Sequence, residues 1–71
     1  MKFIPGTKFI NNTNKNTRLF KRGVLYVLNN VSKNDEGYLY TFKLPQLGEI
    51  KEVQFQKIKQ ADEFLSIINV T

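Results

Sequence analysis

Apolar and polar residues alternate along much of the chain, with the two-residue spacing of half-buried β-strands. The spacing is clearest over residues 38–44, where aromatic and leucine side chains occupy every second position. We expect that face to lie in a core. Residues 24–31 are β-branched or aromatic at half of their positions and apolar on both faces through Leu28, which predicts a central strand.

Turn-forming residues separate the predicted strands. Residues 32–37 (SKNDEG) contain Asn, Asp and Gly, which tolerate the positive φ of tight turns and predict a hairpin. A second turn, PQLG, leads into residues 49–55 as the next strand of an antiparallel meander. Ile50 and Val53 fall on opposite faces of this strand, so we expect a bulge near Glu52.

The first part of the chain has weaker strand signals. Residues 1–10 carry apolar pairs on both sides of Pro5 and Gly6, which predicts an extended arm, a turn and a short strand. The polar run NNTNKNT follows, and its short side chains compete for backbone hydrogen bonds. It therefore predicts an exposed loop over residues 11–18.

After Phe55 the apolar period changes from two residues to about 3.6, which predicts a helix over residues 56–68. The apolar stripe of this helix consists of Ile58, Ala61, Leu65 and Ile68. Its polar face consists of Lys59, Asp62, Glu63 and Ser66. We expect the stripe to cover one face of the sheet, because a helix this short does not stand alone in water.

These elements predict a single α+β domain over residues 1–71, mostly β, with four to five antiparallel strands and one C-terminal helix. Its segments are an arm with a short strand (1–10), the polar loop (11–18), a meander (19–55) and the helix (56–69). Two arrangements fit: a bent sheet closing toward a small SH3-like barrel, which is slightly favoured, and an open sheet with the helix packed across it. The order of elements resembles that of SH3-like and Tudor-like domains, in architecture only.

Composition removes most catalytic chemistry from consideration. The 71 residues include no Cys and no His, so disulfides, thiolate nucleophiles, imidazole acid–base catalysis and the usual zinc sites are excluded. The acids form three pairs: Asp35 with Glu36, Glu49 with Glu52, and Asp62 with Glu63. We interpret all three pairs as structural, because a small domain offers little concavity in which to perturb a carboxyl group. The sequence thus predicts a protein that is not an enzyme and needs no cofactor or metal.

The positive charge is unevenly distributed along the chain. Residues 1–33 hold seven Lys and Arg and no acid, whereas residues 34–71 hold four lysines and six acids, so the two parts carry +7 and −2. The sum is the net charge of +5. Such a split predicts a continuous cationic surface that attracts polyanions, with binding that weakens as salt rises.

The densest part of this charge defines a candidate nucleic-acid site, flanked by two aromatic residues that could stack on bases. The site residues are Lys8, Lys15, Arg18, Phe20, Lys21, Arg22 and Tyr26. Tyr38 and Tyr40 are further candidates for stacking. A competing interpretation places the tyrosines in the core, and Phe20 then anchors the polar loop to that core. The high Lys and Asn content is then explained by an A/T-rich genome.

Two functions follow from these patterns. The first is a non-enzymatic module that binds DNA or RNA through phosphate contacts of its N-terminal half. The second is a small protein-interaction module, a regulator or inhibitor that docks on an acidic partner, of the kind compact viral genomes encode. A homodimer stays open, with residues 24–31 as one sheet edge. Without a long apolar run or a signal-peptide pattern, we expect a cytoplasmic protein with no membrane contact.

Overall fold

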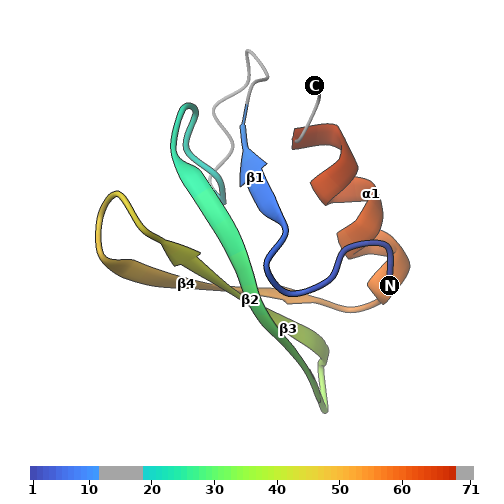
Figure 1. Cartoon of the computed structure of the whole chain (residues 1–71). Helices are drawn as coiled ribbons and strands as arrows, with labels where there is room; N and C mark the ends of the chain where they lie inside the picture. Colours follow the sequence, from blue (N-terminus) through green and yellow to red (C-terminus); the bar gives the residue numbers. More distant parts are fainter. Residues whose placement is uncertain (12–18, 69–71) are drawn as a thin grey trace.

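The computed structural model describes residues 1–11 and 19–68. The described elements are β1 (Lys8–Ile10), β2 (Leu25–Asn34), β3 (Gly37–Leu44), β4 (Glu49–Phe55) and α1 (Ile58–Ile68). The two longest strands, β2 and β3, form a hairpin. The predicted mostly-β α+β fold, with a four-stranded antiparallel sheet and one C-terminal helix, is confirmed (Figure 1).

The four strands pair antiparallel in chain order, β1-β2-β3-β4. The sheet is strongly bent, and α1 runs alongside β1 (Figure 1). α1 contacts β1 and β4, the two edge strands of the sheet. The bent sheet of the prediction is therefore present. In the described residues β1 and β4 do not pair with each other, so no ladder closes the sheet.

The bulge in the sheet lies in a different strand from the one expected. The register of β3 and β4 runs without interruption from Tyr38 opposite Phe55 to the end of the ladder, so the bulge expected near Glu52 is wrong. The irregularity lies instead in β2, between Leu28 and Asn30. The extra residue reverses which side chains of β2 point inward and increases the bend of the strand. Leu28 before the bulge and Val31 after it therefore both pack in the core.

Gly37 stands where the hairpin brings β3 close to the end of β4. Its φ of 132° lies in the region that favours glycine. A Cβ atom at this position would overlap the carbonyl oxygen of Phe55 and lie 2.7 Å from the Cα of Gln56. The backbones can approach this closely only because residue 37 has no side chain.

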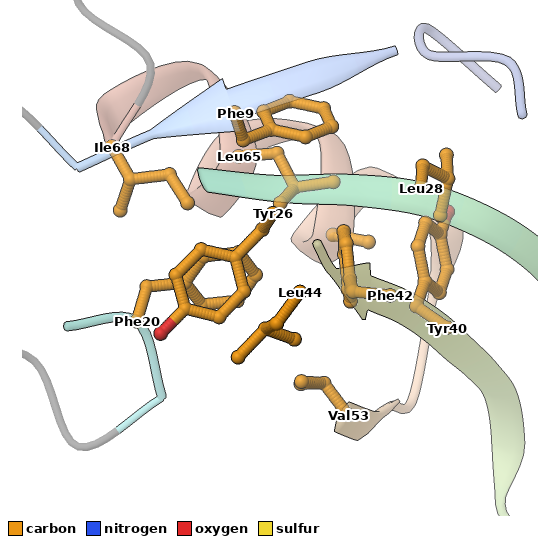
Figure 2. Packing of buried hydrophobic residues seen from close by; sticks show 11 residues of the cluster. Phe9, Phe20, Tyr26, Leu28, Tyr40, Phe42, Leu44, Val53, Leu65 and Ile68 are labelled. Atoms are coloured by element: carbon orange, nitrogen blue, oxygen red, sulfur yellow. The ribbon is translucent and has the colours of Figure 1, made fainter. Parts of the chain in front are cut away.

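Aromatic rings make up most of the core, which fills the space between the concave face of the sheet and α1 (Figure 2). All nine aromatic residues of the chain belong to it: Phe9, Phe20, Tyr26, Tyr40 and Phe42 are buried, and Phe3, Tyr38, Phe55 and Phe64 pack against them. The predicted helix stripe is confirmed at its three buried positions, Ala61, Leu65 and Ile68. The predicted core face of β3 is confirmed as well, since Tyr40, Phe42 and Leu44 are buried.

Candidate nucleic-acid interface

The two aromatic residues of the expected site lie inside the protein. Phe20 is 0% exposed and Tyr26 is 1% exposed. The Phe20 ring centroid lies 4.3 Å from that of Tyr26 and 5.0 Å from that of Phe42 (Figure 2). The expectation that these rings flank a base-stacking surface is therefore wrong, and the competing assignment to the core is correct. Tyr40 is fully buried too, and Tyr38 packs against the core.

Phe20 and Tyr26 instead fix the backbone that carries the neighbouring cations. The Tyr26 hydroxyl accepts a hydrogen bond of 2.8 Å from the backbone N–H of Lys21. The side-chain amide of Asn11 donates to the carbonyl oxygen of Phe20 over 2.9 Å, and the N–H of Gly23 donates to the carbonyl oxygen of Asn11. The segment before β2 is thus attached to both β1 and β2, which holds it in one conformation.

Asn11 is a structural residue that sequence analysis missed. We expected it to begin an exposed polar loop, but its side chain is 0% exposed and bonded to the backbone. A single asparagine at the start of an asparagine-rich run carries no signal that separates it from its neighbours.

The described cations of the expected site are Lys8, Lys21 and Arg22, and all three are exposed. Lys15 and Arg18 lie outside the described residues. Arg22 forms an isolated bridge with Asn11, one residue beyond the end of β1. Lys8 belongs to the same strand, so the structure brings the three described cations to one part of the molecule.

Two lysines that the expected site did not include join this group. Lys8 pairs with Val27, which pairs with Lys43, so both lysines project from the same convex face of the sheet. Two strand spacings separate them, about 10 Å. Lys51 and Lys21 line a hollow of about 260 Å³ at the end of the β3–β4 hairpin. We call the five cations the basic end: Lys8, Lys21, Arg22, Lys43 and Lys51.

Two other cations of the first 33 residues lie elsewhere. The backbone N–H of Lys2 donates to Asp62 Oδ2 over 3.1 Å, and its Nζ donates to Ser66 Oγ over 2.9 Å, both on α1. Lys33 pairs with Tyr38 beside the turn of the β2–β3 hairpin, at the opposite end of β2 from the basic end. The described cations of the N-terminal half therefore do not form the single continuous surface that the charge split predicts.

The basic end also contains acids and exposed apolar side chains. Glu49 lines the hollow beside Lys21 and a second hollow beside Lys43, and the exposed Glu52 follows Lys51 in β4. Leu47 is 52% exposed and Ile50 is 65% exposed. Ile50 pairs with Lys43 across the sheet, so apolar and cationic groups are interleaved on this surface.

Among the described residues, one titratable group has a clearly shifted pKa, and it lies inside the core. Burial, followed by the charge of Asp62 and then Tyr38, raises the pKa of Tyr40. The Tyr40 hydroxyl and Asp62 Oδ1 are both buried and have no hydrogen-bond partner among the described residues. A tyrosine held neutral in this way is a poor general base, so this pair does not add an acid–base site to the cationic one.

Comparison with known proteins does not assign the chain to a family. No protein-family model, curated protein or solved structure matches the chain. In the described ranges, α1 has eleven residues and is too short to cross a bilayer.

Proposed function

We propose that the protein is a non-enzymatic module that binds DNA or RNA through phosphate contacts at the basic end. The observation that carries the proposal is the gathering of five cations around one end of the sheet, with two of them, Lys8 and Lys43, on its convex face and with Glu49 and Glu52 as neighbouring acids. Lysine and arginine side chains at such a surface release condensed counterions when they neutralise phosphates, and that release favours association. The hydrogen bonds of Lys21 and Asn11 support the same proposal, because they order the backbone before binding.

This mode of binding has a defined chemical character. The five buried aromatic rings cannot stack on bases unless the core opens, and the other four are half-buried against that core, so base stacking has little part in this mode. Contacts limited to phosphates carry no sequence information, and the affinity then depends on charge and salt. We therefore expect weak sequence preference, and a logarithmic salt dependence with a slope of about −0.9 per phosphate contacted on duplex DNA.

A fluorescence anisotropy titration tests the proposal with single- and double-stranded DNA and RNA at two salt concentrations. The informative variant is Lys21→Ala with Arg22→Ala, which removes two charges from the basic end. The control is Lys57→Ala with Lys59→Ala, which removes the same charge from exposed positions at the start of α1. We expect the first pair to weaken binding and flatten the salt slope by about one to two phosphate equivalents, and the control to do much less. Absence of binding at low salt would refute the proposal.

A second function is favoured by the exposed Leu47 and Ile50, because phosphate contact does not need apolar side chains. In this function the basic end docks on the acidic surface of a larger protein, with Leu47 as an anchor inside a ring of lysines. Affinity capture with the wild-type protein and with Leu47→Glu separates the two. A protein partner that is lost with Leu47→Glu favours docking, whereas nucleic-acid binding that is unchanged by it favours the phosphate mode.

A further inference from the structure

The outer edge of β4 is open along its length in the described structure. β4 is the last strand of the sheet and pairs with β3 alone. No backbone hydrogen bond from another described element reaches its other side. Proteins usually blunt such an edge with a proline, a bulge, a short strand or charged side chains, and of these β4 has the charged side chains Glu49, Lys51 and Glu52. β4 has seven residues, no proline and no bulge in its ladder, whereas β1, the other edge strand, has three residues.

The side chains near the start of β4 combine one exposed apolar residue with charges of both signs. Ile50 is 65% exposed, although β-branched residues in strands normally pack against a neighbour. Glu49 and Lys51 flank it, and both project from the opposite face of the strand. The strand thus carries an apolar residue between an acid and a base, at a backbone edge that can accept another strand.

We propose that two copies of this chain form a dimer by antiparallel pairing of the first three residues of their β4 strands, Glu49–Lys51, with the twofold axis at Ile50. In this register Ile50 lies opposite Ile50 of the second copy. Glu49 lies opposite Lys51 of the second copy, and the same pair occurs again by symmetry. Each directly opposed pair shares one face of the joined sheet, as antiparallel pairing requires.

Charge selects this register over its neighbours. Moving the axis to Lys51 places two lysines directly opposite each other, and moving it to Glu52 does the same with two glutamates. Like charges in directly opposed positions destabilise a strand pair, whereas opposite charges stabilise it. The same complementarity favours a second copy over an unrelated peptide, because the acid and the base that must meet are both present in β4.

The segment that the sequence suggests for edge pairing, residues 24–31, lies largely in β2 and pairs with β3 on one side. On its other side the ladder with β1 covers only residues 25–27, and the bonds of Leu28 extend it by one residue. Residues 24–31 contain no charged side chain, so they lack the complementary pair that β4 has in Glu49 and Lys51. The dimer proposal does not rest on nucleic-acid binding, but the two share Lys51, which belongs to the basic end and also pairs with Glu49 of the second copy. Dimerisation would therefore engage one of the five cations and place two basic ends next to each other.

The test is sedimentation velocity over a range of protein concentrations at an ionic strength of about 0.15 M, which screens the repulsion between two molecules of net charge +5. The variants are Glu49→Lys and Lys51→Glu, each of which places like charges opposite each other twice in a homodimer. Each is expected to raise the dimer dissociation constant by about tenfold or more. An equimolar mixture of the two variants restores complementary pairs and is expected to form heterodimers, which native mass spectrometry resolves.

The substitution Ile50→Lys is a second test of the dimer. It replaces the two isoleucines at the centre of the interface by lysines and leaves the Glu49–Lys51 pairs unchanged. Its matched control is Ile67→Lys on α1, where the isoleucine is 63% exposed and lies away from β4. Circular dichroism establishes that each variant is folded before its mass is measured. Ile50→Lys is expected to be monomeric and Ile67→Lys dimeric. A wild-type protein that stays monomeric at every concentration, or a dimer that both charge variants leave unchanged, overturns the proposal.

Discussion

Removing the Phe20 ring separates a core role for this residue from a role in binding. The ring is 0% exposed and lies within 6 Å, centroid to centroid, of Tyr26 (4.3 Å), Phe42 (5.0 Å) and Phe64 (5.7 Å). Replacing a buried phenylalanine by alanine usually costs about 3–5 kcal/mol, and a ring with three aromatic neighbours belongs in the upper part of that range. At about 0.05–0.15 kcal/mol per residue, a domain of this length has a free energy of unfolding of about 4–11 kcal/mol.

Phe20→Ala is therefore expected to leave a marginally folded or unfolded protein. Urea unfolding followed by far-UV circular dichroism measures the loss, with tyrosine fluorescence as a second probe because the chain has no Trp. The control is Phe20→Leu, which keeps an apolar side chain and should cost about 1–2 kcal/mol. Phe20→Leu should also bind polyanions as the wild type does. The reasoning is refuted if Phe20→Ala loses less than about 1 kcal/mol of stability while its polyanion affinity falls.

Three further substitutions test other features of the fold. Gly37→Ala should lower the stability of the fold by about 1–3 kcal/mol, because its Cβ would overlap the Phe55 carbonyl oxygen and its backbone has a positive φ. Thermal unfolding measures this loss, and unchanged stability would contradict the expectation. Asn11→Ala should cost about 1–3 kcal/mol in urea unfolding, because it leaves the buried Phe20 carbonyl without this donor. The raised pKa of Tyr40 means that the unfolded chain loses the proton first, so stability falls as pH rises above about 10. Tyr40→Phe should reduce that fall between pH 9 and 11, and an identical pH profile would count against it.

The strands and the helix were predictable because their signals are periodic. The alternation over residues 38–44 places three side chains of β3 in the core, and the helical stripe includes the three buried residues of α1, Ala61, Leu65 and Ile68. The bulge was not predictable, because the register of β2 depends on which residues β3 places opposite it. Asn29 and Asn30 are alike in sequence, and nothing in that pair indicates which side of the break each lies on.

The sequence could predict only those cations of the candidate site that are close together along the chain. Lys21 and Arg22 are sequence neighbours of Phe20, but the ring points inward while the two cations are exposed. Lys43 and Lys51 lie in the half of the chain with a net negative charge, and the meander carries them to the N-terminal cations. Charge summed over a stretch of sequence cannot detect such a gathering, because strand pairing joins residues that are far apart in the chain.

The aromatic core draws on both ends of the chain, and this affects how the protein is made. Phe3 and Phe9 pack in the same cluster as Phe64 and Leu65, so the rings from the first strand are covered only when α1 is present. A ribosome that has synthesised the sheet but not the helix carries a chain with unshielded rings. Contacts between residues so far apart slow folding and prolong that interval. Folding of this domain should therefore wait for the synthesis of α1, and until then the nascent chain should be a good client for chaperones that bind aromatic segments.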